Sequence, residues 1–240
     1  MYYYFLFLLI LFPCLVLSAW ASAKVHTTFA KYDRVQTRSM MTGYDTAVRL
    51  MQNRGVNDIT VNRIGGSLTD HYHPAKREVN LSASTYGSAS VAAVGVAAHE
   101  IGHVMQNKKG YVPYHIRRVL VPIANIGSRL ALPLIIAGIF VDIFWLSLPY
   151  AVGQWMMYVG IGLYSLSTLF MLVTLPVEFN ASRRARKMLI EDGILTKEEA
   201  KGARKVLSAA AMTYVASLLI SLVYFLRLLI IVLSFAGKKK

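Results

Sequence analysis

The sequence predicts a mainly α-helical membrane protein, with about four transmembrane helices and a small α+β domain on the cytoplasmic side. Two observations support this fold class: 55% of the 240 residues are hydrophobic, and several apolar runs are long enough to cross a bilayer. A third is that polar segments of mixed helix and strand pattern separate these runs. We therefore expect a multi-pass protein of the cell membrane, in contact with the lipid bilayer.

The basic composition agrees with a membrane location. The formal net charge is +14, from 26 Lys and Arg against 12 Asp and Glu. A nucleic-acid-binding surface would carry a stripe of basic and aromatic residues outside the apolar runs. Here the basic residues gather beside the apolar runs, where loops face anionic lipid. The sequence therefore predicts no nucleic-acid partner.

Residues 1–23 are predicted to form the first transmembrane helix. The alternative is a signal peptide cleaved near residues 21–23, where the side chains are small. A signal peptide starts with positive charge, but the first basic residue of this chain is Lys24. Because basic residues such as Lys31 and Arg34 follow the apolar run instead, we expect a retained helix whose N-terminus is outside.

Residues 24–118 are predicted to form the catalytic segment. Thr42 can cap a helix through the backbone of Asp45, and alternation of apolar and polar residues predicts strands at 59–64 and 78–82. The second strand is a candidate edge for binding an extended substrate by main-chain hydrogen bonds. The alternative is a small sheet that only packs on the next helix. The candidate substrate-binding residues are Val79, Asn80 and Leu81.

An Ala/Val-rich helix then carries the run His-Glu-Ile-Gly-His at residues 99–103. His99 and His103 lie one turn apart on one helix face, so both imidazoles can bind one metal ion. Glu100 lies beside them, where a metal-bound water would be. The alternative is a pair of hydrogen-bonded core histidines, but the small Gly102 permits close packing at the site. The pattern His-Glu-x-x-His is typical of zinc metallopeptidases.

Upstream of this helix, His71 and His73 could supply a metal ligand or a hydrogen bond to the oxyanion of the reaction. Arg183 is a further oxyanion candidate, and Asp70 could orient one of the histidines. The alternative is that these residues are structural or exposed, because two histidines spaced by one residue share a strand face whatever their purpose.

Residues 119–176 are predicted to hold an interfacial stretch at 119–128 and a transmembrane hairpin. The hairpin has spans at 130–148 and 151–175. Its link has no Lys or Arg, so it should turn outside and return the chain to the cytoplasm.

Residues 177–208 are predicted to open with Glu178 at the start of a helix, on the same side of the bilayer as the two histidines. A catalytic zinc needs three protein ligands and one open position, and Glu178 is the candidate for the third. The alternative is a helix-start acid that offsets the dipole. Thr196 and Glu199 predict a second helix in this segment, while Asp192 lies in a charged stretch and is not expected to bind metal.

Residues 209–240 are predicted to form the fourth transmembrane helix, at 212–235, and a basic tail. Arg227 lies within this span, and an intramembrane charge indicates function, snorkelling or pairing. Its candidate partner is Asp142.

The run His-Glu-x-x-His, a hairpin and then Glu178-x-x-Ala181 resembles the gluzincin membrane proteases of the HtpX and CAAX prenyl protease type. Their third ligand is the Glu of a Glu-x-x-Ala-Asp motif, but this chain has Ser182 in place of the Asp. The chain resembles more closely the YugP-like neutral zinc metallopeptidases of bacterial membranes. Three runs look alike in order and spacing: residues 70–74, 97–103 and 176–185. The resemblance implies a zincin-like catalytic domain and a zinc-dependent membrane peptidase.

The sequence therefore predicts a membrane-embedded endopeptidase that cleaves membrane or membrane-proximal proteins through a zinc-activated water. His99, His103 and Glu178 would hold Zn²⁺, and Glu100 would take the proton of the water and deliver it to the leaving amine. One alternative is a zinc-binding membrane scaffold or chaperone-like protein without peptidase activity. Another is a lipid-binding protein that uses its basic face.

Overall fold

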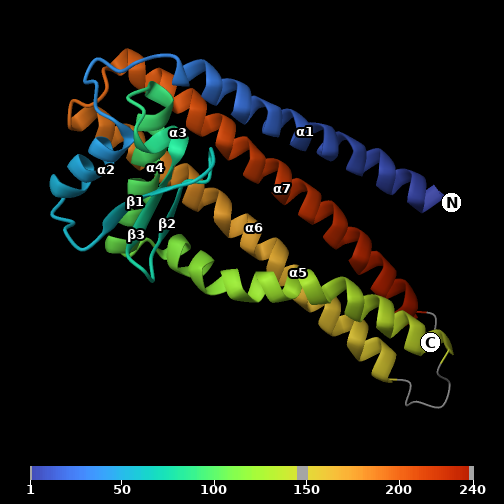
Figure 1. The fold of residues 1–240 in the computed structure, drawn as a ribbon. Coiled ribbons are helices and arrows are strands. Elements are labelled where there is room, and N and C mark those ends of the chain that lie inside the picture. The colour runs from blue at the N-terminus through green and yellow to red at the C-terminus, as the bar shows by residue number, and fades with distance from the viewer. Residues whose placement is uncertain (1, 145–150, 238–240) are drawn as a thin grey trace. The chain divides into compact units, whose positions relative to one another are not determined.

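The chain is mainly helical, with a small mixed sheet. A computed structural model describes residues 2–144 and 151–237 (Figure 1). Within these ranges the elements are, in chain order, α1 (Tyr2–Asp33), α2 (Gly43–Gln52), β1 (Thr60–Ile64), β2 (His71–His73), β3 (Glu78–Ser82), α3 (Ala83–Tyr86), α4 (Val91–Lys108), α5 (Val112–Phe144), α6 (Ala151–Glu191) and α7 (Lys197–Gly237).

Four of the described helices are long and apolar enough to cross a membrane. Their candidate spans are Phe5–Asp33, Val112–Phe144, Val152–Glu191 and Lys197–Phe235. This finding confirms the predicted helical class and its four apolar helices. The predicted hairpin link, at residues 147–150, lies outside the described residues.

Two predicted helix boundaries are wrong. Helix α5 continues through Pro122 and Pro133, so residues 119–128 are not a separate interfacial stretch. Helix α6 continues through Pro176, so Glu178 lies inside a helix and does not open one. A proline removes one backbone donor, and the remaining hydrogen bonds of a long apolar helix still favour its continuation.

Reciprocal capping starts two helices where the sequence predicts them. The hydroxyl of Thr42 accepts from the backbone N–H of Asp45, whose side chain accepts from the backbone of Thr42. The same exchange joins Thr196 and Glu199 at the start of α7. Helix α7 then runs on to Gly237, so the cytoplasmic helix and the fourth span, predicted as separate helices, are one.

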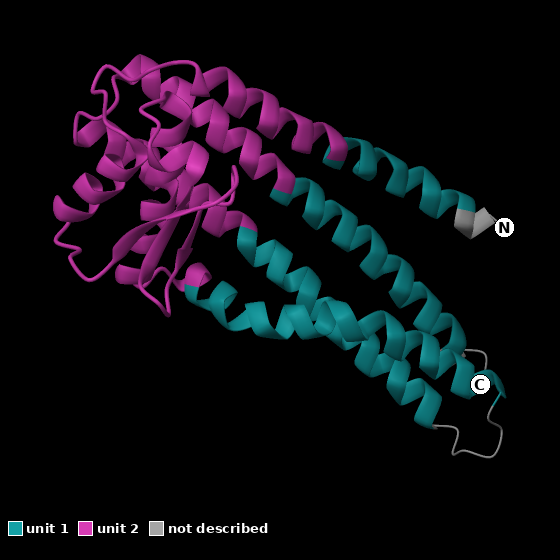
Figure 2. Ribbon diagram, viewed as in Figure 1, with its two compact units in different colours: residues 1–18, 115–174, 214–240 teal, residues 19–114, 175–213 magenta. Residues whose placement is uncertain are grey.

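The chain forms two compact units (Figure 2). Unit 1 contains residues 1–18, 115–174 and 214–240, and unit 2 contains residues 19–114 and 175–213. The four long helices contribute residues to both units. The dividing points lie close to the segment ends predicted at residues 23, 118, 176 and 208.

Unit 1 consists of the apolar parts of the four long helices. Within it, the guanidinium carbon of Arg227 lies 4.1 Å from the centroid of the Phe7 ring. This cation–π contact joins α7 to α1 and gives the intramembrane charge an aromatic partner. Pairing of Arg227 with Asp142 stays a prediction.

Unit 2 contains the sheet, whose strand order is β1-β3-β2. Strand β3 pairs with β1 in parallel and with β2 in antiparallel orientation. The substrate-strand prediction for Val79, Asn80 and Leu81 is therefore wrong, because both sides of β3 are already paired. The sequence could not reveal this, since strand order depends on the path of the connections. Among the described residues, β2 is the outer strand on the antiparallel side of β3.

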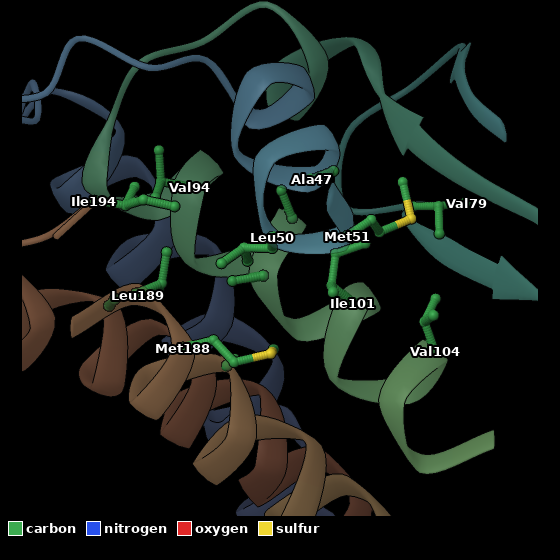
Figure 3. Close-up of a cluster of buried hydrophobic side chains, with 14 of the residues drawn as sticks. Ala47, Leu50, Met51, Val79, Val94, Ile101, Val104, Met188, Leu189 and Ile194 are labelled. Atoms are coloured by element: carbon green, nitrogen blue, oxygen red, sulfur yellow. The ribbon is translucent and has the colours of Figure 1, made fainter. Parts of the chain in front are cut away.

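The hydrophobic core of unit 2 joins the sheet to α4. Val79 and Leu81 of β3 are fully buried in a cluster with residues of α2, α4 and α6 (Figure 3). The α4 residues Val94, Ile101 and Val104 belong to the same cluster. Because α4 is packed on this side, its opposite side is available to build a site with α6.

Candidate metal centre

Helix α4 has a firmly held start. The Ser90 hydroxyl accepts from the backbone N–H of Ala93 at 3.1 Å and donates to a carboxylate oxygen of Asp33 at 2.7 Å. Ser90 is therefore the N-cap of α4. This cap ties the end of α1 to the helix that carries both metal-site histidines.

Close packing brings α4 against α6. A Cβ atom on Gly102 would lie 2.6 Å from the carbonyl oxygen of Ala181 and 3.1 Å from its Cα. Such a distance leaves no room for a side chain at Gly102. The predicted role of this glycine in close packing is therefore confirmed, and the contact places the turn from His99 to His103 beside the turn that contains Glu178.

Two imidazoles and one carboxylate converge in unit 2. The Glu178 oxygen Oε2 lies 3.2 Å from His99 Nε2 and 3.7 Å from His103 Nε2. The candidate ligand atoms of all three residues lie within 4.8 Å of one another. The structure thus brings together three residues that the sequence predicts as metal ligands, although Glu178 is 75 positions after His103 in the chain.

The chemistry of this group fits zinc. Neutral imidazole nitrogens and a carboxylate oxygen are ordinary zinc ligands, and three protein ligands are typical of catalytic sites. The side chain of Glu178 is only 3% exposed. A buried carboxylate is costly unless cationic or hydrogen-bonding groups compensate it, and a divalent cation would supply that compensation here.

Each histidine has a second polar partner behind it. The Nδ1 atom of His99 lies 3.2 Å from the Ser182 hydroxyl, and that of His103 lies 3.0 Å from Gln106 Oε1. Ser182 therefore takes the position of a supporting group even though it is not an Asp. Gln106 was not among the predicted site residues, although its place one turn after His103 on the same helix was an available signal.

Glu100 is buried beside the two histidines. Burial raises the pKa of Glu100 to about 7, with His99 opposing this rise and Glu178 adding to it. A carboxyl group with this pKa exists in both protonation states near neutral pH. It can therefore accept a proton and return it.

Two candidate residues before β3, Asp70 and His71, make hydrogen bonds to groups outside the candidate metal centre. Asp70 accepts from the backbone and hydroxyl of Ser82 at 2.8 and 2.9 Å. It therefore orients Ser82, whereas the sequence predicted that it would orient one of the two histidines. The ring of His71 lies 2.9 Å from the Thr69 carbonyl and 3.2 Å from the Asn80 amide. Both Asp70 and His71 still influence the pKa of Glu100 electrostatically.

The other candidates lie outside the three-residue group. His73 accepts from the backbone N–H of Lys76 at 3.2 Å. Arg183 is exposed and does not belong to the group of His99, His103 and Glu178. Asp192 pairs with Arg54 at 2.7 Å, and its lack of a role in metal binding stays a prediction.

Comparison with known proteins identifies the family. The sequence profile of the family described as "Putative neutral zinc metallopeptidase" matches residues 7–233. The "Putative membrane protease YugP" of Bacillus subtilis (strain 168) is 40% identical over 229 residues, which cover 95% of this chain and 97% of that protein. No solved structure matches the chain. The chain belongs to the family described as putative neutral zinc metallopeptidases.

Proposed function

We propose that the protein is a membrane-embedded zinc-dependent endopeptidase that hydrolyses peptide bonds of membrane or membrane-proximal proteins. The observation that carries the proposal is the convergence of His99, His103 and Glu178 beside the buried Glu100. Membership of a zinc metallopeptidase family and similarity to a protein named as a membrane protease support it.

The residues of the site divide the work. His99 and His103 would hold zinc through Nε2, and Glu178 through Oε2. When bound, zinc supplies Lewis acidity, which lowers the pKa of a water molecule and polarises a substrate carbonyl. Glu100 accepts the proton of the attacking water and then donates it to the leaving amine.

Strand β2 is the proposed binding edge for the substrate, in place of β3. Within the described part of the chain it pairs with β3 and with no other strand, and the Tyr72 hydroxyl accepts from the Asn107 side chain of α4 at 3.1 Å. An extended peptide could therefore add to this edge by main-chain hydrogen bonds. His71 is exposed on the same strand and is retained as a candidate oxyanion donor.

The proposed orientation places unit 2 in the cytoplasm. Basic residues are favoured in cytoplasmic loops next to membrane spans. Lys24 and Lys31 in α1 and Arg183 and Arg184 in α6 all lie in unit 2, next to apolar parts of their helices. This pattern supports cytoplasmic catalysis at or near the membrane surface.

The number of donors favours a peptidase over a zinc-binding scaffold. A closed structural site would need a fourth protein ligand, and the group found among the described residues has three members. His71 and His73, which the sequence also offers as possible metal ligands, make hydrogen bonds elsewhere.

Replacement of Glu100 tests the function. Cells would produce the wild-type protein, Glu100→Gln or His99→Ala, and new protein N-termini in their membranes would be compared by mass spectrometry. We expect cleavage products with the wild type alone, while zinc analysis of detergent-purified Glu100→Gln still finds bound metal. Undiminished cleavage by Glu100→Gln, or a wild-type protein without zinc affinity, would refute the proposal.

A further inference from the structure

We infer that Gln106 is a positioning residue that holds His103 in the tautomer with its proton on Nδ1, and that Asn180 and Arg184 fix Gln106 in the required orientation. The inference rests on the proposed zinc site and adds to it a specific hydrogen-bond relay. All of these residues lie in unit 2.

The side-chain amide of Gln106 is completely buried and makes three hydrogen bonds. Its Nε2 atom donates to the backbone carbonyl of Val177 at 2.8 Å and to Asn180 Oδ1 at 3.1 Å. Its Oε1 atom lies 3.0 Å from His103 Nδ1. Both hydrogens of the amide are therefore engaged on α6, at the residue directly before Glu178 and at the second residue after it.

The partners of Gln106 determine which way its amide points. A backbone carbonyl can only accept, so the group that faces Val177 must be the NH₂ of Gln106. Its oxygen then faces His103, and an amide oxygen can only accept. His103 must consequently donate from Nδ1, so in the neutral ring the lone pair is on Nε2, the atom that lies 3.7 Å from Glu178 Oε2.

Arg184 fixes the relay at its other end. Its Nε atom, which can only donate, lies 2.7 Å from Asn180 Oδ1. This assigns Oδ1 as the acceptor and excludes the flipped orientation of the Asn180 amide. The Arg184 guanidinium also lies 5.9 Å from the centroid of the Tyr111 ring. The orientation of Gln106 is thus set on both sides by groups that have one hydrogen-bonding role.

The two histidines are supported differently. The partner of His99 is the hydroxyl of Ser182, which can either donate or accept. A hydroxyl therefore does not select a tautomer. We expect metal affinity to depend more on Gln106 than on Ser182, because removal of Gln106 releases His103 from its metal-binding tautomer.

Four variants of the full-length protein in detergent test the relay. Gln106→Met keeps the length of the side chain and removes all three hydrogen bonds. Asn180→Leu removes the acceptor, while Asn180→Asp keeps an oxygen that accepts from both Gln106 and Arg184. Ser182→Ala removes the partner of His99.

Zinc affinity is measured by competition with a chromogenic chelator, and the visible spectrum of the cobalt-loaded protein reports on coordination. We expect Gln106→Met to weaken zinc binding about 10- to 100-fold, the usual effect of losing such a supporting group. Asn180→Leu should weaken it in the same direction, Asn180→Asp should restore it, and Ser182→Ala should have a smaller effect than Gln106→Met. In the metal-free wild type, ¹⁵N chemical shifts should show the His103 proton on Nδ1.

The outcomes separate the inference from the proposed function. If Gln106→Met binds zinc as tightly as the wild type does, the inference is overturned, but the proposed zinc site is unaffected. If Gln106→Met does not fold, the two Asn180 variants test the relay. Equal loss of zinc affinity in Asn180→Leu and Asn180→Asp would overturn it. A wild-type protein without zinc affinity would overturn both.

Discussion

Gly102 and Ala181 are in contact through their backbones: a Cβ atom on Gly102 would lie 2.6 Å from the Ala181 carbonyl oxygen. A backbone atom cannot rotate away as a flexible side chain can. This contact therefore fixes how closely the turn with His99 and His103 approaches the turn with Glu178. The spacing of the three candidate ligands depends on the absence of a side chain at Gly102.

Gly102→Ala should weaken zinc binding and destabilise the protein. The added methyl group forces α4 and α6 apart, and overpacking of this kind costs about 1–3 kcal/mol. Zinc affinity and thermal unfolding in detergent measure the two effects. The matched control is Gly95→Ala on the same helix, where the new Cβ would lie 3.1 Å from the Ala203 side chain. We expect this control to retain zinc affinity; wild-type affinity in Gly102→Ala would contradict the prediction.

The stability of the metal-free protein should depend on pH through Glu100. Burial raises the pKa of Glu100 from 4.5 to about 7, so the folded state holds this proton more tightly than the unfolded chain. Its contribution to the unfolding free energy therefore falls as pH rises from 4.5 to about 7 and is constant above that range.

Glu100→Gln removes this dependence. At pH 8 the metal-free variant should be more stable than the metal-free wild type by about 3 kcal/mol, since one pKa unit corresponds to about 1.4 kcal/mol. At about pH 4 this difference should largely vanish, because the carboxyl is then mostly protonated in both states. Thermal unfolding at the two pH values checks the prediction, and equal melting temperatures at pH 8 would show it to be wrong.

Asp192 should stabilise unit 2 at neutral pH. It accepts from Arg54 at 2.7 Å and from Asn53 at 2.9 Å. Burial alone would raise the pKa of Asp192, but these hydrogen bonds outweigh it and hold the pKa below 3.8. The stabilisation is therefore present above pH 3.8 and is lost as pH falls through the lower pKa of the folded state.

Asp192→Asn should lower the unfolding free energy at pH 7 by about 1–3 kcal/mol, the usual value for a hydrogen bond to a charged group. The loss should shrink in acid, below the pKa of the folded state. The control is Glu198→Gln, which removes an exposed ion pair with Lys201 and should change stability little. An Asp192→Asn protein as stable as the control at pH 7 would argue against the pair.

Local sequence patterns predicted much of the fold. The capping residues Thr42 and Thr196 mark the starts of α2 and α7 because a cap and its partner are three residues apart. The limits of β3 and the presence of four long apolar helices were also predictable, since alternation and hydrophobic length are read directly from neighbouring residues. The predicted boundaries within α5 and α6 were wrong, because a long helix that contains prolines tolerates the loss of single backbone hydrogen bonds.

By itself, the sequence determined the chemical types of the candidate site: two histidines one helical turn apart, a carboxylate between them, and Glu178 after a long apolar run. Only the tertiary structure decided which strand is central, how closely α4 approaches α6, and that Gln106 bonds to Val177 and Asn180. The physical reason is range. Spacing along one helix fixes which side chains share a face, but contacts across about 70 residues depend on how two helices pack.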